Sequence, residues 1–396
     1  MWDGDEQAQE DTRALRFVAI ELGQSVALGG DVRLELAPGT TVLVGRNGTG
    51  KSAILENIHA VLRSVVGLGP SPPSLSRVTC DLQLRDRTIQ YQCIWIPAPV
   101  TDLEQDDRPR PPTVEERCAL VSPLRQLLWQ VHQGRLTFGD SDEQTALPGK
   151  TLLQWLTSTD MPVNAPREVL PLFNLFAWTS HVRAGGLRDS SERSELILPR
   201  AVLKWKRSPE YAKRTELGKL MRSIAFLGDE PRDEIAAIGR RIGAFQRIEV
   251  KHYRDPDRSS PSPNDFVAVS VDGVDLGLLS DGTLRVLQLL LALLSEDTKL
   301  LLIDEPESAV HPGLLGKLLH EISAYSADRQ IVISTHSPQV VSWALPEAIR
   351  VVTRTDGATR VQALGERTIR HLEKYLHDED TLGQFIYGGG LDGIEP

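Results

Sequence analysis

The sequence has few cysteines, no long apolar run and no basic excess, and each absence removes a class of protein. Three cysteines occur among 396 residues, without a C-x-x-C pair, so neither a zinc site nor a disulfide framework is expected. The most apolar run, 284–294, contains Arg285 and Gln288 and is too short to cross a bilayer. The formal net charge of −10 disfavours a protein that binds polyanions over its whole surface.

The first residues also lack the features of a secretory signal. Residues 1–6 show no basic residue followed by an apolar run, so we expect a cytoplasmic protein without a membrane partner. Residues 1–12 hold five acidic residues and no basic one, which predicts a disordered tail. No heptad run is long enough for an extended coiled coil.

The most informative stretch is residues 45–52, which fit G-x-x-x-x-G-K-[ST] at every fixed position. An apolar strand pattern, 41–44, precedes this stretch, and residues 52–62 have helical spacing. Glycines let successive backbone N–H groups wrap a phosphate, and a helix N-terminus attracts the same charge. The expected ATP-binding residues are Gly45, Arg46, Asn47, Gly48, Thr49, Gly50, Lys51 and Ser52. The alternative is a glycine-rich turn that binds nothing.

Lys51 is expected to reach the β- and γ-phosphates, and the Ser52 hydroxyl to ligate Mg²⁺. The apolar strand 300–303 ends in two carboxylates: Asp304, expected to hold Mg²⁺, and Glu305, expected to orient or deprotonate the attacking water. The alternative is a core strand that merely ends in acidic residues.

Two further sites complete the predicted ATP machinery. Ser280 and Gly282 precede a helix and would form a second anion-binding end, although a serine N-cap has the same sequence. His336 follows a strand and would contact the γ-phosphate and the water, although a structural histidine is the general default. His311 and Pro312 are interpreted mainly as a turn entering a helix, with contact across a dimer as the lesser interpretation.

Strand and helix patterns alternate in the last third of the chain, which predicts an α/β fold with a largely parallel sheet and helices on its faces. The expected strands are 16–20, 32–36, 247–252, 266–271, 299–303, 330–334 and 349–352, and the expected helices there are 283–295 and 314–325. The predicted parts are a tail (1–12), an ATPase N-lobe (13–97), a mainly helical insertion (98–230), an ATPase C-lobe (231–366) and a helical tail (367–396).

Within these parts, 77–85 and 88–96 are predicted to form a hairpin in which Cys80 faces Cys93. Two reduced core residues are the favoured interpretation of this pair, and a redox pair is the alternative. In the insertion, residues 114–131, 152–156 and 169–182 carry apolar residues at helical spacing.

The segment 200–258 is locally basic, with fifteen Lys or Arg residues and nine Asp or Glu. It is interpreted either as a surface that docks DNA or a partner, or as a solvated helix face with ordinary charge pairs.

The four motifs, in this order, resemble the ABC-type ATPase heads of the SMC, RecF and OLD-like branch, and the ATPases of Septu-like anti-phage systems. The resemblance covers about residues 13–97 and 231–355. It implies a P-loop NTPase head with a mixed sheet and an antiparallel β subdomain. It also implies a head-to-tail homodimer, or a higher even oligomer, that encloses ATP. Glu305 would be the catalytic base and His336 the switch histidine, while Ser280 and Gly282 would come from the partner chain.

Several features depart from that family. Lys51 and Ser280 are far more widely separated than in transporter subunits, and the residues after His336 are too few for a TOPRIM nuclease domain. Gln83, Gln90 and Gln92 lie near the expected position of a Q-loop glutamine, but none can be assigned. Three hypotheses follow: an ATPase that controls a partner nuclease in anti-phage defence, a DNA-repair ATPase that binds DNA through 200–258, and a scaffold that binds ATP without hydrolysis.

Overall fold

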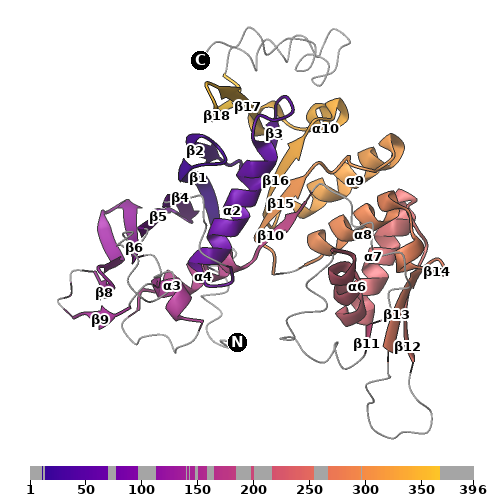
Figure 1. Cartoon of the computed structure of the whole chain (residues 1–396), viewed down its shortest axis with the longest axis horizontal. Helices are drawn as coiled ribbons and strands as arrows, with labels where there is room; N and C mark the ends of the chain where they lie inside the picture. The colour runs from indigo at the N-terminus through magenta and orange to yellow at the C-terminus, as the bar shows by residue number, and fades with distance from the viewer. Residues whose placement is uncertain are drawn as a thin grey trace, which may run out of the picture. The chain divides into compact units, whose positions relative to one another are not determined.

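The computed structural model describes residues 11, 14–69, 77–96, 113–139, 141, 143–147, 150–157, 165–183, 198–199, 216–253, 266–295 and 297–365. Its chain divides into two units (Figure 1). Unit 1 comprises Met1–His181, Asp297–Asp304 and Ser326–Pro396, and unit 2 comprises Val182–Glu296 and Glu305–Tyr325. The expected disordered tail, apart from Asp11, and the expected helical tail at 367–396 lie outside the described residues.

Unit 1 contains an antiparallel sheet in the order β2-β1-β4-β5-β6-β7-β8-β9. Its strands are β1 (Leu15–Ser25), β2 (Gly30–Glu35), β4 (Arg77–Leu84), β5 (Arg87–Ile96), β6 (Thr113–Ser122), β7 (Gln126–His132), β8 (Arg135–Phe138) and β9 (Thr145–Ala146). Along β4 and β5 the buried residues alternate with less buried ones, as expected when one face of a sheet packs on a core.

The second sheet of unit 1 has the order β10-β15-β16-β3-β17-β18. Its strands are β10 (Thr179–Val182), β15 (Leu300–Asp304), β16 (Gln330–Thr335), β3 (Thr40–Val44), β17 (Ile349–Thr355) and β18 (Ala358–Ala363). The middle four, β15, β16, β3 and β17, are parallel, and β18 returns antiparallel to β17. β15 and β16 are buried along their whole length, which explains their nearly continuous apolar sequence. The predicted α/β fold with mixed sheets is therefore confirmed.

Helix α2 (Lys51–Val65) contacts strands of both sheets, namely β1 on one side and β15 and β16 on the other (Figure 1). Its aliphatic residues at three- and four-residue spacings are all buried: Ile54, Leu55, Ile58, Val61, Leu62 and Val65. Each such side chain contributes about 2 kcal/mol of burial. The N-cap, Gly50, supplies no side-chain hydrogen bond. Burial, rather than capping, therefore holds this helix in place.

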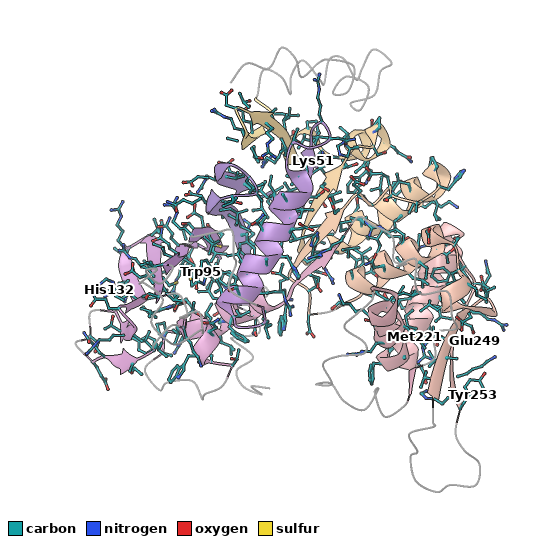
Figure 2. All side chains as sticks on the ribbon, viewed as in Figure 1. Lys51, Trp95, His132, Met221, Glu249 and Tyr253 are labelled. Carbon is teal, nitrogen blue, oxygen red and sulfur yellow. The ribbon has the colours of Figure 1, made fainter. Side chains whose placement is uncertain are left out.

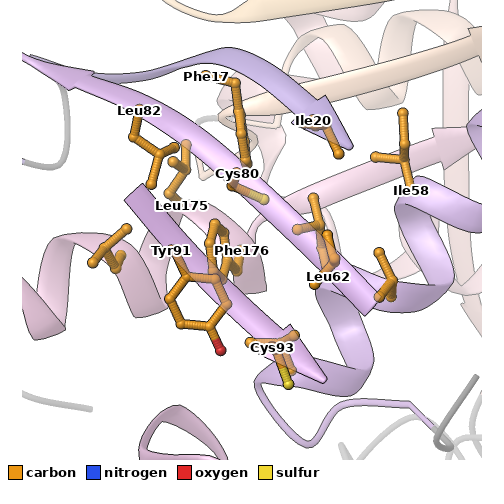
Figure 3. Packing of buried hydrophobic residues seen from close by; sticks show 14 of the residues in the cluster. Phe17, Ile20, Ile58, Leu62, Cys80, Leu82, Tyr91, Cys93, Leu175 and Phe176 are labelled. Atoms are coloured by element: carbon orange, nitrogen blue, oxygen red, sulfur yellow. The ribbon is translucent and has the colours of Figure 1, made fainter. Parts of the chain in front are cut away.

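A continuous core fills unit 1 around α2 (Figure 3). Phe176 of α4 (Val169–Ala177) stacks on Phe17 of β1 with ring centroids 5.8 Å apart, and meets the edge of Tyr91 at 5.0 Å. The short helix α3 (Leu152–Trp155) is joined to the end of α2, because the Thr151 hydroxyl donates to the Val65 carbonyl at 2.6 Å. After β16 come α10 (Pro338–Trp343) and the 3-10 helix η2 (Pro346–Ala348).

Unit 2 combines an antiparallel sheet with four helices among its described residues. The sheet has the order β11-β13-β12, with β14 also paired to β13. Its strands are β11 (Leu198–Pro199), β12 (Ile248–Tyr253), β13 (Phe266–Val271) and β14 (Val274–Asp275). The helices are α6 (Glu216–Phe226), α7 (Asp229–Ile242), α8 (Asp281–Leu293) and α9 (Pro312–Tyr325), and the 3-10 helix η1 (Leu276–Leu278) precedes α8. No helix within the described ranges has the length and apolarity needed to span a bilayer.

The predicted β4–β5 hairpin forms, but its register was wrong by two residues. Cys80 lies opposite Tyr91, and Cys93 lies opposite Val78. The two-residue turn is Arg85-Asp86, because Arg85 adopts a positive φ of 55° there. A slip of two residues keeps every side chain on its predicted face. The three cysteines are free and buried, and burial raises the pKa of each thiol far above its ordinary value, which supports the interpretation of Cys80 and Cys93 as reduced core residues.

The predicted helix over residues 114–131 was also wrong, because this segment forms β6 and β7. The inward positions of β6 include Val114, Glu116 and Cys118, so a buried carboxyl interrupts the apolar alternation that would have identified a strand. The helices predicted at 152–156 and 169–182 are confirmed as α3 and α4, although residues 179–182 form β10. The part of the expected insertion up to residue 181 belongs to unit 1, and its strands extend the antiparallel sheet.

Glu116 is the polar group of this core, with 2% of its surface exposed. Its carboxylate accepts hydrogen bonds from the Tyr91 hydroxyl at 2.9 Å and from the Leu152 N–H at 2.5 Å. Burial raises the pKa of Glu116 from its ordinary value of 4.5 to about 7, against the opposing effect of these hydrogen bonds. The side chain is therefore largely protonated in the folded protein at mildly acidic pH.

This raised pKa predicts a pH dependence of stability. Between about pH 4.5 and pH 7 the folded state binds more protons at Glu116 than the unfolded state, so the free energy of unfolding falls as pH rises. Substitution Glu116→Gln removes the ionisable group and should reduce that fall by about 3 kcal/mol. Urea unfolding at about pH 5 and about pH 8 measures the difference. Glu143→Gln, at an exposed position, is the control. The prediction would be contradicted if the free energy of unfolding of Glu116→Gln fell between the two pH values by as much as that of the wild type.

Candidate functional site

The loop from Gly45 to Gly50 joins the end of β3 to the start of α2 in unit 1, as predicted. Gly48 and Gly50 have φ values of 79° and 107°, which glycine adopts without strain. A Cβ at Gly45 would lie 2.1 Å from the Val352 carbonyl oxygen, so the loop passes directly against β17. The Thr49 hydroxyl closes a turn inside the loop by donating to the Arg46 carbonyl at 3.0 Å.

Lys51, labelled in Figure 2, is the first residue of α2, and its ammonium group lies within the loop. Its Nζ donates to the carbonyl oxygens of Gly45 at 2.9 Å and Arg46 at 3.1 Å. The same Nζ lies 2.9 Å from Nε2 of His336, which follows β16. Lys51 is only 4% exposed, so its charge is concentrated within the loop and favours an anion there. The structure thus brings together two predicted residues that are far apart in the sequence.

Asp304 ends β15 at the same edge of the sheet. In the parallel register, Asp304 pairs with Ser334 of β16, and Ser334 pairs with Leu43 of β3, so the carboxyl ends of these strands meet beside the loop. Asp304 Oδ1 accepts hydrogen bonds from the hydroxyls of Ser52, at 2.9 Å, and Ser334. Ser334 was not among the predicted site residues, and its only signal in the sequence is a polar residue at the end of an apolar strand.

The pair Ser52 and Asp304 fits the Mg²⁺ that the motif implies. Their oxygens are 2.9 Å apart. Neighbouring ligands of an octahedral ion with bonds of 2.0–2.1 Å are separated by about the same distance. Among the described residues, no group of three or more His, Cys, Asp and Glu is arranged to hold a metal. The Mg²⁺ that the motif implies would take its remaining ligands from phosphate and water.

Ser280, Gly282 and Glu305 belong to unit 2. Ser280 is the N-cap of α8, and its Oγ accepts the Thr283 N–H at 3.1 Å, so the N-cap interpretation describes its role within the chain. A Cβ at Gly282 would lie 2.6 Å from the Ala309 carbonyl oxygen, which requires glycine at that position. The start of α8 is therefore packed against the segment that follows Glu305.

Arg285 of α8 connects that helix to the backbone of Glu305 within unit 2. Arg285 is 3% exposed, and its guanidinium donates to the Glu305 carbonyl at 3.1 Å, the Arg183 carbonyl at 2.5 Å and Gln288 Oε1 at 3.1 Å. Glu305 has a φ of 48°, which a non-glycine residue adopts only when its surroundings hold it. Arg285 supplies one such restraint on the predicted catalytic base.

The other predicted residues have ordinary roles. His311 accepts the Gly313 N–H through Nδ1 at 3.1 Å and begins the turn into α9, as the main interpretation expected. The glutamines near the expected Q-loop position make hydrogen bonds within β4, β5 and their turn: Gln83 to Arg85, Gln90 to Asp81 and Gln92 to Thr79. None of these bonds reaches the phosphate-loop residues.

Most of the basic surplus of residues 200–258 lies outside the described residues. The described part, 216–253, has seven Lys or Arg residues and six Asp or Glu. Four of the basic residues form ion pairs: Arg232 with Asp229, Arg241 with Glu321, and both Arg247 and Lys251 with Glu249. In this part of the chain the solvated, charge-paired surface describes the residues better than a DNA-binding face.

A family model described as "AAA domain, putative AbiEii toxin, Type IV TA system" matches residues 186–342. That range contains Ser280, Asp304, Glu305 and His336, but not the loop at 45–52. No curated protein matches the sequence significantly.

Several solved structures are similar to this chain. An SMC head bound to the C-winged helix domain of ScpA is 14% identical with a TM-score of 0.43, over 89% of this chain and 99% of that one. The SMC head domain from Thermotoga maritima is 14% identical with a TM-score of 0.39, over 88% of this chain and 99% of that one. An Smc head domain with an extended coiled coil, bound to the C-terminal domain of ScpA derived from Pyrococcus furiosus, is also similar. It is 12% identical with a TM-score of 0.41, over 91% of this chain and 100% of that one. These values are too low to transfer any property from those proteins.

The strand–loop–helix unit and the Asp304 carboxylate, two strands away in the same sheet, form the arrangement of a P-loop nucleotide site, and part of the chain matches an AAA-domain model. The family match includes Ser280, Asp304, Glu305 and His336. The phosphate loop at 45–52 lies outside the match and is supported by its own geometry.

The loop geometry predicts different costs for two glycine substitutions. Gly48→Ala places a Cβ in open space and should lower the free energy of unfolding by about 1 kcal/mol, because only its positive φ is unfavourable. Gly50→Ala also brings a Cβ to within 2.6 Å of Thr359 Oγ1 and should cost at least about twice as much. Urea unfolding without nucleotide measures both, and equal losses would show that Thr359 does not close on Gly50.

Proposed function

We propose that this protein binds Mg²⁺-ATP at the unit 1 site and hydrolyses it to ADP and phosphate. The observation that carries the proposal is the set of three groups at one sheet edge: the buried Lys51 ammonium inside the loop, the Ser52–Asp304 oxygen pair and the His336 imidazole. A cation, a pair of metal-binding oxygens and a helix N-terminus beside a glycine loop are what a bound triphosphate requires.

Each residue has a defined part in this reaction. The loop N–H groups and Lys51 hold the phosphates, and Lys51 exchanges its carbonyl partners for phosphate oxygens. Ser52 and Asp304 would hold Mg²⁺, which would neutralise charge on the phosphates. Glu305 accepts a proton from the attacking water as the water oxygen bonds to the γ-phosphorus and the bond from that phosphorus to the bridging oxygen breaks, which gives ADP and phosphate. His336 donates a hydrogen bond to the γ-phosphate.

Two substitutions separate binding from hydrolysis. Lys51→Ala should weaken ATP binding about 10- to 100-fold, because it removes a charge-assisted hydrogen bond. Glu305→Gln should retain binding and abolish turnover. Titration calorimetry and phosphate release measure the two effects, with Lys219→Ala on the exposed face of α6 as the control. A wild-type protein that binds ATP without releasing phosphate would favour the non-hydrolysing scaffold instead.

We propose further that two copies associate head to tail around ATP. Ser280 and Gly282 would contact the nucleotide of the partner chain, as the resemblance to ABC-type heads implies. Ser280 is exposed, and the preceding Leu278 has 72% of its surface exposed, which suits an apolar contact made on association. The positive end of α8 lies beside Ser280 and favours a phosphate.

Association should therefore depend on nucleotide and on Ser280. Glu305→Gln with Mg²⁺-ATP should elute as a dimer in size-exclusion chromatography with light scattering, because unhydrolysed ATP keeps the interface closed. Adding Ser280→Arg to Glu305→Gln should return the protein to a monomer. Ser223→Arg on the exposed face of α6 is the matched control. A monomer in every nucleotide state, or a dimer unaffected by Ser280→Arg, would contradict the head-to-tail arrangement.

We place this ATPase in bacterial anti-phage defence, as the regulator of a partner effector, which we propose is a nuclease. Two observations support this role: the motif order resembles OLD- and Septu-like ATPases, and the matched family model carries a toxin–antitoxin description. The alternative is a DNA-repair ATPase that binds DNA directly through residues 200–258. Affinity for duplex DNA that falls steeply as salt rises would favour the alternative.

A further inference from the structure

Thr359 of β18 is buried and uses both of its hydrogen-bond donors near the phosphate loop. It is 2% exposed. Its N–H donates to the Leu28 carbonyl at 2.7 Å, and its hydroxyl donates to the Thr49 carbonyl at 2.9 Å. Leu28 lies in the turn between β1 and β2, so Thr359 joins this turn to the loop. None of the predicted ATP-site motifs contains Thr359.

The Thr49 carbonyl belongs to the peptide bond that precedes Gly50. In a trans peptide the C=O and the following N–H point in opposite directions. A carbonyl held by Thr359 therefore turns the Gly50 N–H away from β18. Phosphate binding in such loops requires N–H groups directed at the anion and carbonyl oxygens directed away from it. By holding the Thr49 carbonyl, the Thr359 hydroxyl fixes the peptide between Thr49 and Gly50 in the orientation that phosphate binding requires.

The hairpin formed by β17 and β18 contacts both ends of the loop. The Val352 carbonyl of β17 lies against Gly45, where a Cβ would approach to 2.1 Å. Thr359 lies against Gly50, where a Cβ would lie 2.6 Å from Oγ1 and 3.2 Å from Cγ2. The β17–β18 hairpin therefore restrains the conformation of the loop at Gly45 and at Gly50. Thr359 adds a hydrogen bond from its side chain to the loop backbone.

We propose that Thr359 is a positioning residue for nucleotide binding, which orients the peptide between Thr49 and Gly50 so that its N–H faces the phosphates. The proposal rests on the ATP-binding function proposed above. Its consequence is specific to phosphate, because the base and ribose make no use of that N–H.

The test compares side chains that differ in the hydroxyl alone. Thr359→Val keeps the shape and removes the oxygen, and should raise the Kd for both ATP and ADP about tenfold. Thr359→Ser keeps the hydroxyl and should stay within about twofold of wild type. Thr359→Ala against Thr359→Ser repeats the comparison with smaller side chains if the valine variant does not fold. Thr353→Val, at an exposed position of β17, is the control.

Three measurements separate positioning from a purely structural role. Calorimetry with ATP, ADP and adenosine should show that the loss in Thr359→Val is confined to the phosphorylated ligands. Steady-state turnover should show a raised KM with little change in kcat. Thermal unfolding without nucleotide shows whether the variant is intact.

The outcomes distinguish the two proposals. A wild-type protein without affinity for ATP overturns the proposed function and this inference with it. A wild type that binds ATP, a Lys51→Ala variant that binds it about 10- to 100-fold more weakly, and a Thr359→Val variant within about twofold of wild type overturn the role of Thr359 alone. Equal losses in Thr359→Ser and Thr359→Val, or an equal loss of adenosine binding, also overturn it.

Discussion

The parallel pairing of β3 with β16 on one side and β17 on the other determines the arrangement of the site. Parallel strands end at the same edge, so this pairing brings the phosphate loop, which follows β3, beside His336, which follows β16. The further pairing of β16 with β15 adds Asp304. A shift of one residue in any of these registers would turn the polar ends of the strands to the opposite face.

A second constraint joins the two sheets of unit 1. Gln330, the first residue of β16, is 4% exposed, and its side-chain amide donates to the carbonyls of Phe17 and Ala37 while its oxygen accepts the Phe17 N–H. A buried amide whose hydrogen bonds are made in this way fixes the relative position of the segments that it joins. Gln330 thereby holds β1 against the sheet that carries the site.

The sequence predicted those parts of the molecule in which each residue obeys a local rule. The loop at 45–52, the strand ending in Asp304 and the turn at His311 were identified because their residue types and spacing follow from chemistry within a few positions. Residues 114–131 were misassigned because Glu116 is satisfied by Tyr91 and Leu152, partners that no local pattern reveals. Ser334 and Thr359 were missed for the same reason, since each acts on a group more than two hundred residues away or on another strand. The hairpin register depended on the conformation of Arg85, which residue type does not specify.

The order of synthesis has a consequence for the sheet that carries the loop. Thr40 of β3 pairs with Ile331, and Ile349 pairs with Val42, so both neighbours of β3 leave the ribosome long after β3 itself. Until then β3 has two unpaired edges and an apolar sequence, which makes a shortened chain prone to aggregation. The loop contacts made by Val352 and Thr359 also form only after about 300 further residues have been synthesised beyond the loop. A chain that stops before β18 therefore lacks the strands and contacts that shape the phosphate loop.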